Sequence, residues 1–205
     1  LETFEEAKVI LLFHLTGTVM EWFKVSAGSW AYPEPALFKL FDVLLFSGFM
    51  YASVGSFIAR VIRLFEMRFA PYPPIGLTFL LALAIYANFF THHFIWDLRL
   101  ALIAATVAVY GRTMISYRVG RRHRMNLVLA GALSSFFLWL AENIGTLTGT
   151  WVYSGKHVSS FASLSKMGSW YLLLYVAFIT VTVVVRPRSD EPAAEGYESN
   201  RADRE

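Results

Sequence analysis

The chain has 205 residues, of which 56% are hydrophobic and only 16% are charged. A soluble domain carries roughly a quarter charged residues, so this composition excludes an ordinary soluble protein and indicates a membrane protein. The sequence has no cysteine, which excludes disulfides, thiolate metal sites and cysteine nucleophiles. The net charge is +3, but the arginines lie in short loops between apolar runs, as expected for membrane topology, so no nucleic-acid partner is expected.

Six apolar runs approach the roughly 20 residues that a transmembrane helix needs, within a range of about 17 to 25. The predicted fold class is therefore all-α, a polytopic bundle of six transmembrane helices that occupies residues 1–185 as one integral membrane domain. The residues that follow, 186–205, are polar and contain Pro187 and Pro192, which predicts a disordered tail. The predicted helices cover residues 7–23, 37–62, 75–90, 95–111, 126–147 and 167–185.

Basic residues are distributed unequally between the two sides of this bundle. Arginine accumulates in the loops 63–74 and 112–125 and in the tail. By the positive-inside rule this side is cytoplasmic. We therefore expect a multi-pass protein of the bacterial cytoplasmic (inner) membrane with its C-terminal tail in the cytoplasm. The basic run YRVGRRHR, residues 117–124, is interpreted as a topology-setting loop, with binding to anionic lipid headgroups as a secondary interpretation. The opposite loops hold only Lys24, Arg99, Lys156 and Lys166.

The pattern E-x6-G-x-W-x-Y occurs twice, each time where an apolar run ends and a loop begins. An internal repeat indicates an architecture built from one unit used more than once. A second apolar run with a matching glycine and tyrosine follows each copy, which predicts a two-copy helix–loop–helix repeat around a central helix pair. An even number of helices separates the copies, so both loops are expected to face outward. The repeated residues are Glu21, Gly28, Trp30 and Tyr32, followed by Gly48 and Tyr51, and Glu142, Gly149, Trp151 and Tyr153, followed by Gly168 and Tyr171.

Polar and small residues form stripes on several predicted helices. On the first helix, His14, Gly17, Thr18 and Glu21 follow the i, i+3, i+4, i+7 spacing of one face, which must therefore meet other helices. Asp97 shares a side with the alanines of the fourth helix and is predicted to point into the bundle. The second helix carries a small-x3-small surface that allows close backbone approach, formed by Gly48, Ala52, Gly55, Ser56 and Ala59.

These stripes predict a polar pocket beneath the outer surface, at the outer ends of helices one, three, four and five. Ionisable groups inside a membrane span cost about 2.5 to 3.5 kcal/mol each on insertion scales, so they tend to pair or to line a functional cavity. The candidate catalytic residues are Glu21 and Glu142. The candidate ligand-binding residues are His14, Trp30, Tyr32, His92, His93, Asp97, Asn143, Trp151 and Tyr153.

Structural interpretations remain open for the same residues. The glutamates stand near helix ends, where interfacial water could solvate them, and the loop aromatics could form an interfacial belt. Adjacent His92 and His93 cannot both point into one pocket from a helix. A histidine with Glu142, Glu21 and Asp97 could bind a metal ion, but no tight ligand motif such as HExxH occurs, and no cofactor is expected.

Long phrases of the chain, in order, resemble the YoaT-like family of uncharacterised bacterial multi-pass membrane proteins. The phrases are EWFKVSAGSWAYPEP, FSGFMYASVGSFIAR, IYANFFTHHF, WLAENIGTLTGTWVY and KMGSW. The resemblance covers nearly the whole chain. It implies a membrane bundle with further N-terminal helices before Leu1, and it brings no established activity.

The repeat unit alone is also similar to a motif of intramembrane lycopene cyclases and, more loosely, of carotenoid hydratases. Those enzymes are thought to protonate a polyene with carboxylic acids and without a redox cofactor, and the matching acids here are Glu21 and Glu142. The cyclases carry a Pro-x-Glu motif in the next helix, where this chain reads DVLLFSGFMY without a glutamate.

Two classes of function follow from the sequence. The first is an intramembrane enzyme or binder of an apolar lipid or isoprenoid, carotenoid-like ligand, in which Glu21 or Glu142 acts as a general acid because apolar surroundings favour a neutral carboxyl group. The second is a non-catalytic accessory subunit of a larger membrane complex, or a small-solute or ion transporter. The expected partners are membrane lipids, an isoprenoid or carotenoid ligand and partner membrane subunits.

Overall fold

The described residues form six helices that pack into one bundle, in agreement with the predicted helix number. The computed structural model of the protein describes residues 3–32, 37–40, 43–44, 47–148, 152–153 and 164–185. The predicted disordered tail lies outside these residues. The helices are α1 (Phe4–Ser26), α2 (Ser47–Leu64), α3 (Ile75–Thr91), α4 (Arg99–Tyr110), α5 (Leu127–Leu147) and α6 (Leu164–Val185).

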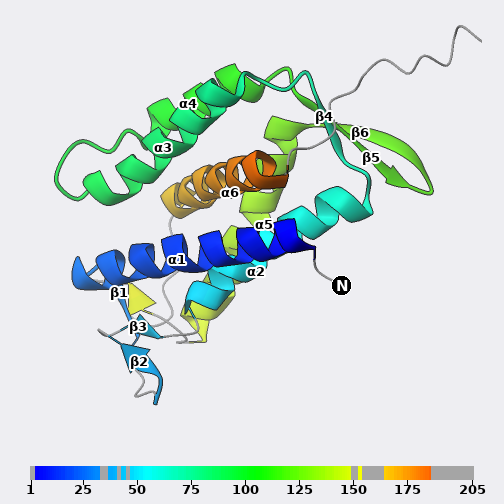
Figure 1. Cartoon of the computed structure of the whole chain (residues 1–205). Helices are drawn as coiled ribbons and strands as arrows, with labels where there is room; N and C mark the ends of the chain where they lie inside the picture. The colour runs from blue at the N-terminus through cyan, green and yellow to red at the C-terminus, as the bar shows by residue number, and fades with distance from the viewer. Residues whose placement is uncertain are drawn as a thin grey trace, which may run out of the picture.

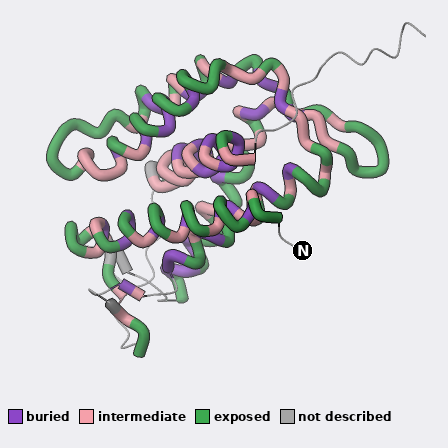
Figure 2. The backbone as a smooth tube through the Cα atoms, viewed as in Figure 1, coloured by how far each residue is buried: buried purple, intermediate pink, exposed green. Residues whose placement is uncertain are grey.

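Helix α6 lies at the centre of the bundle and contacts each of the other five helices. In Figure 1 it runs between the α1–α2 pair and the α3–α4 pair. Its sequence is apolar on all sides, which is typical of a helix that other helices surround. Figure 2 shows this difference in burial. Helix α6 is mostly buried or half-buried, whereas the outer helices alternate between buried and exposed residues.

Three helices are long and apolar enough to cross a membrane: Phe4–Ser26, Leu127–Leu147 and Lys166–Val185 within α6. Helices α3 and α4 are also apolar but shorter. Leucine, valine and phenylalanine side chains cover the outward faces of these helices, as expected for surfaces in contact with lipid tails. The protein is thus a polytopic transmembrane helix bundle.

Helices α1 and α2 pack along each other through small residues. A Cβ atom added at Gly17 of α1 would lie 2.6 Å from the ring of Tyr51 on α2, and one added at Gly55 would lie 2.6 Å from the ring of Phe13. Gly48, Ala52 and other small residues of α2 are buried at this contact. The predicted small-x3-small surface is therefore confirmed as a helix–helix interface.

The predicted second helix, residues 37–62, is too long at its N-terminal end. Helix α2 begins at Ser47, and the segment before it forms the short antiparallel strands β2 (Lys39–Leu40) and β3 (Val43–Leu44). The Lys39 ammonium donates a hydrogen bond to the backbone oxygen of Tyr32, at 3.0 Å.

The basic loops are also more ordered than an all-α prediction implies. Strands β4 (Arg68–Ala70), β5 (Met114–Val119) and β6 (Arg121–Asn126) form an antiparallel sheet in the order β4-β5-β6. The run predicted as a topology loop is thus a hairpin, and Gly120 turns it with a φ of +67°, which favours glycine. The predicted helical bundle is confirmed, and this small sheet is an addition to it that lies at the opposite end of the bundle from β1–β3 (Figure 1).

The two repeat loops meet at that other end. Strand β1 (Trp30–Ala31) pairs antiparallel with β7 (Val152–Tyr153), so that Trp30 lies opposite Tyr153. The chain leaves α1 through Gly28, whose φ of +68° is the left-handed conformation that commonly ends a helix. The backbone pairing therefore joins the two copies of the E-x6-G-x-W-x-Y pattern.

Candidate functional site

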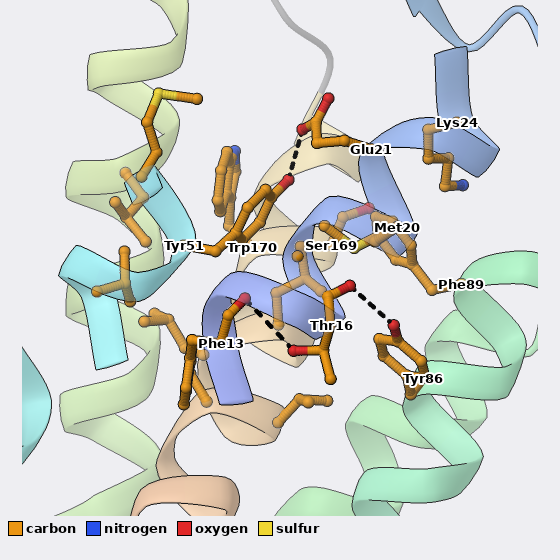
Figure 3. A pocket seen from close by; sticks show the side chains of 18 of the residues that line it. Phe13, Thr16, Met20, Glu21, Lys24, Tyr51, Tyr86, Phe89, Ser169 and Trp170 are labelled. Atoms are coloured by element: carbon orange, nitrogen blue, oxygen red, sulfur yellow. Dashed lines mark hydrogen bonds between the residues drawn. The ribbon is translucent and has the colours of Figure 1, made fainter. Parts of the chain in front are cut away.

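A cavity of about 420 Å³ lies inside the bundle, beneath the β1–β7 strand pair. Its lining comes from all six helices and from the loop after α1, and the lining surface is mostly apolar. Both repeat glutamates, Glu21 and Glu142, line this one cavity. The sequence predicted a polar pocket, whereas this cavity is mainly apolar and carries the two carboxyl groups on its wall; Figure 3 shows Glu21 among the lining residues.

Glu21 is only 3% exposed and is held by two tyrosines. The hydroxyl of Tyr51 on α2 donates to its Oε1 at 2.8 Å, and the hydroxyl of Tyr32, after β1, donates to its Oε2 at 3.0 Å. Gly17, one turn earlier on α1, makes room for the Tyr51 ring. Glu21 and Gly17 belong to the same stripe of α1. The glutamate supplies a buried carboxyl group at the cavity wall, and the glycine leaves space for the tyrosine that binds it.

Glu142 on α5 is equally buried, at 3% exposure, but has a different partner. The indole N–H of Trp170 on α6 donates to its Oε2. In the repeat, Trp170 stands where the first copy has Met50, which also lines the cavity. Tyr171, the counterpart of Tyr51, lies instead with its hydroxyl 3.0 Å from Oγ1 of Thr106 on α4.

Three basic residues line the cavity in addition to the glutamates. They are Lys24 at the end of α1, Arg99 at the start of α4 and Lys166 at the start of α6. The side chain of Lys24 is buried, with Nζ 3.0 Å from Nε2 of His93 and 4.1 Å from the ring centroid of Phe89. The cavity therefore combines an apolar interior with both signs of charge on its wall.

Asp97 does not point into the bundle as predicted. Helix α4 begins at Arg99 rather than at residue 95, which leaves Asp97 exposed in the preceding loop. Its carboxylate accepts the backbone N–H of Arg99 at 2.9 Å and pairs with the Arg99 guanidinium at 2.9 Å. Partial burial would raise the pKa of Asp97, but the bonds and charge of Arg99, together with Asn88, lower it below its usual value.

The rings of His92 and His93 lie against each other, with centroids 4.2 Å apart, but their nitrogens have different partners. His92 turns back to the end of its own helix, with Nδ1 3.0 Å from the backbone oxygen of Asn88. His93 reaches the cavity edge, where its Nε2 lies 3.1 Å from Oγ of Ser29 as well as close to Lys24. His93 thus contacts Lys24 and Ser29 of the lining, whereas the ring of His92 packs against the lining residue Phe89, with ring centroids 6.2 Å apart.

Desolvation is the main reason why the pKa values of His92 and His93 are lowered from the ordinary value. The nearby charge of Lys24 lowers both pKa values further. At neutral pH the two rings are therefore uncharged, and Nε2 of His93 can accept a hydrogen bond from the Lys24 ammonium.

Two further predicted residues lie away from the cavity. His14 packs its ring 4.4 Å from that of Phe49, within the α1–α2 interface. The Asn143 side chain donates to the backbone oxygen of Trp139 in its own helix, at 2.7 Å. Of the aromatic candidates, Tyr32 lines the cavity. Trp30 and Tyr153 contribute backbone pairing, and Trp151 lies outside the described residues.

Sequence reasoning missed several residues that complete the site, namely Tyr51, Tyr86, Trp170 and the three cations. Tyr51 belongs to the repeat, so its conserved spacing within the two copies was a usable signal. The three basic residues could also have been identified from the sequence, because they lie in the loops that contain few other basic residues. Tyr86 gave no such signal, and its hydroxyl donates to the Thr16 backbone oxygen at 3.1 Å (Figure 3).

A metal centre is not assembled within the described part of the chain. No group of three or more histidine, aspartate or glutamate side chains is placed there to hold a metal ion. Glu21 and Glu142 line the cavity, whereas Asp97 is in the α3–α4 loop and His14 is in the α1–α2 interface. The described residues therefore do not bring together the metal ligands that the sequence suggested, namely a histidine with Glu21, Glu142 and Asp97.

Comparison with known proteins confirms the resemblance to the YoaT-like family. The family described as "Protein of unknown function (DUF817)" matches residues 1–178. The uncharacterized protein YoaT of Bacillus subtilis (strain 168) is 44% identical over 194 residues, which span 94% of this chain and 74% of that protein. Similarity to lycopene cyclases is not shown by these comparisons.

Among solved structures, the chain is similar to MvINS, a mycobacterial Insig homolog from Mycobacterium vanbaalenii. The TM-score is 0.63 at 16% identity, with 93% of this chain and 98% of that chain covered. A structure of a cross-linked MvINS trimer gives a TM-score of 0.61 at 15% identity, with the same coverage. At these identities the likeness shows the fold alone.

Proposed function

Because the chain belongs to the DUF817 family of proteins of unknown function, which supplies no activity, we propose from the geometry that it binds an apolar lipid or isoprenoid ligand within the membrane. The observation that carries this proposal is that Glu21 and Glu142 line the same apolar cavity. In the proposal the ligand's hydrocarbon part fills the cavity and its polar end lies at the charged part of the wall, to which the two carboxyl groups belong.

The size and lining of the cavity support a small amphipathic ligand. About 420 Å³ falls within the range of about 300 to 1,000 Å³ that is usual for small-molecule sites. Phe13, Met20, Val54, Leu138 and Leu173 supply an apolar wall inside the bundle. A few convergent polar groups within such a wall fix the orientation of a ligand.

The glutamates are held in place before any ligand arrives. Donors from three elements fix them, since Tyr51 and Tyr32 bond to Glu21 and Trp170 bonds to Glu142. Each carboxylate oxygen can accept more than one hydrogen bond. A ligand hydroxyl or other donor can therefore join the existing bonds without rearrangement of the wall.

The test is to purify the full-length protein from its native membrane, extract what is bound and identify it by mass spectrometry. We expect an apolar lipid or isoprenoid that is enriched over the bulk membrane extract. Glu21→Gln and Glu142→Gln should lower its recovery several-fold, because the amide replaces carboxylate acceptors. Glu5→Gln, an exposed change on α1, is the matched control. Recovery of bulk membrane lipid alone would contradict the proposal.

Intramembrane acid catalysis is the second candidate, favoured by the same observation that two carboxyl groups face one cavity. In this case one carboxyl group protonates a carbon–carbon double bond of the bound ligand, and the carbocation then returns a proton from a neighbouring carbon to the carboxylate, which leaves an isomerised product and regenerates the acid. The extracts then contain this product, and Glu142→Gln should abolish it, so that the smaller amount of ligand still recovered is all unaltered. Product formation that is unchanged in Glu142→Gln would remove this candidate and leave binding intact.

The basic hairpin and loops also support an orientation for this function. The arginines of β5 and β6 are exposed at one end of the bundle, and β1, which is followed by the cavity-lining Tyr32, lies at the other end (Figure 1). By the positive-inside rule we infer that the hairpin is cytoplasmic in the bacterial inner membrane and that the cavity opens toward the outer leaflet.

A further inference from the structure

Lys24 is a buried cation on the wall of the cavity. The residue is 2% exposed, and within the described part of the chain its ammonium forms no ion pair. Its contacts are the Nε2 atom of His93 at 3.0 Å and the ring of Phe89. An ammonium has three donors and a charge that is costly to bury without an anion.

The neighbouring groups do not supply that anion. His93 is a neutral acceptor at pH 7, because burial and the charge of Lys24 lower its pKa. Asp97 pairs with Arg99 at 2.9 Å in the α3–α4 loop, and its charge acts on Lys24 more weakly than the opposing charges of Lys166 and Arg99. Lys166 and Arg99 line the same cavity, and their charges act on Lys24 with the same sign.

The polar wall is layered along α1. Lys24 follows Glu21 by three residues, so the two lie on adjacent parts of one helix face, with Lys24 nearer the helix end. Figure 3 shows both side chains leaving this last part of α1. Glu21 is bonded to its two tyrosines and Glu142 to Trp170. The cationic layer therefore lies outside the carboxyl layer, at the level of the loops.

We propose that the ligand of this cavity is an anionic amphiphile whose carboxylate or phosphate head binds Lys24, with Arg99 and Lys166 beside it. This inference rests on the proposed function, because it specifies the chemistry of the ligand. The hydrocarbon chain runs from the head, past the glutamates, into the apolar interior. The bound head supplies the counter-charge that Lys24 otherwise lacks, and such charge-assisted hydrogen bonds are stronger than neutral ones.

The experiment uses the full-length protein in nanodiscs of zwitterionic phosphatidylcholine. Equilibrium binding of radiolabelled oleate, oleyl phosphate and oleyl alcohol is measured, and empty nanodiscs give the background from membrane partition. The three probes share one hydrocarbon chain and differ in the head. The two charged probes separate a fatty-acid ligand from a lipid phosphate.

At least one charged probe should bind about tenfold more tightly than oleyl alcohol. Lys24→Gln should weaken binding of the charged probe until the preference is lost, whereas Lys24→Arg should retain the preference. Lys8→Gln, at the exposed opposite end of α1, is the control and should behave as the wild type.

The outcomes separate the two proposals. If no probe binds above the empty nanodiscs, the proposed function itself is overturned. If all three bind equally to the wild-type protein, binding in the cavity stands and the anionic head is rejected. The same rejection follows if Lys24→Gln keeps the preference for the charged probe. The wild-type comparison decides the matter even where a variant does not fold.

Discussion

Glu21 and Glu142 occupy equivalent positions in the repeat, yet different donors reach them. Two phenol hydroxyls hold Glu21, and one indole N–H holds Glu142. The exchange of Met50 for Trp170 between the copies accounts for the difference, because only the indole can donate a hydrogen bond. The two carboxyl groups therefore face one cavity in different chemical environments, and substitutions at them need not have equal effects.

His92 and His93 make stability depend on pH. Their pKa values are lowered in the folded protein by burial and by the charge of Lys24. A lowered folded pKa means that the unfolded chain binds more protons, so the contribution to stability is present above the unfolded pKa, about 6.5, and is lost as the pH falls through the folded values. The double variant His92→Gln/His93→Gln should therefore lose less thermal stability between pH 7.5 and about pH 5 than the wild type.

Thermal unfolding in detergent, followed at several pH values, measures this difference. His123→Gln in the hairpin, where the ring stacks on Tyr117, is the control and should keep the wild-type slope. Equal slopes for the double variant and the wild type would show that the two imidazoles do not contribute to the pH dependence.

At the scale of the elements, most helix ends follow the predicted boundaries to within a few residues, the start of α2 differs most, and local hydrogen bonds account for two of the smaller shifts. A capping box explains why α1 starts at Phe4, since Thr3 and Glu6 exchange side-chain and backbone hydrogen bonds. Helix α4 starts four residues late because Asp97 accepts the Arg99 N–H in the loop. Hydropathy alone identifies apolar runs, but such local hydrogen bonds decide where a helix begins.

The candidate site was predictable to the extent that it depends on the repeat. The repeat placed Glu21 and Glu142 at equivalent helix ends, and both line the cavity. Contacts between elements far apart in the chain were not predictable, such as the approach of Lys24 to His93. The sequence pattern carries periodicity along one helix, whereas these contacts depend on how separate helices pack.

The close packing of α1 on α2 predicts that one methyl group added at Gly17 lowers the free energy of unfolding. In Gly17→Ala the new Cβ would lie 2.6 Å from Tyr51, so the ring must move and its bond to Glu21 is disturbed. Overpacking of this kind typically costs about 1 to 3 kcal/mol. Gly76→Ala is the matched control on α3, where nothing lies within 4 Å of the added Cβ.

Thermal unfolding of both variants measures this effect. The Gly17→Ala protein should unfold at a lower temperature than the wild type. The Gly76→Ala protein should be unchanged or slightly more stable, because alanine favours a helix over glycine. A Gly17→Ala protein as stable as the control would contradict close packing between α1 and α2.

At the scale of the whole molecule, the absence of cysteine makes the proposed orientation measurable. Trp96, in the α3–α4 loop, is 89% exposed, and Val119, in the hairpin, is 53% exposed. In intact cells a membrane-impermeant maleimide should label Trp96→Cys and should label Val119→Cys only after permeabilisation. The reverse pattern would invert the orientation and would place the cavity toward the cytoplasm.

The central place of α6 also has a consequence for biosynthesis. Residues 164–185 leave the ribosome after the other five helices, because synthesis proceeds from the N-terminus. Before α6 is inserted, the surfaces of the other helices that contact α6 in the folded protein can contact only lipid or one another. The cavity wall formed by Ser169, Trp170 and Leu173 is likewise missing from the nascent chain. A ligand can therefore be enclosed only in the last stage of assembly, after insertion of α6.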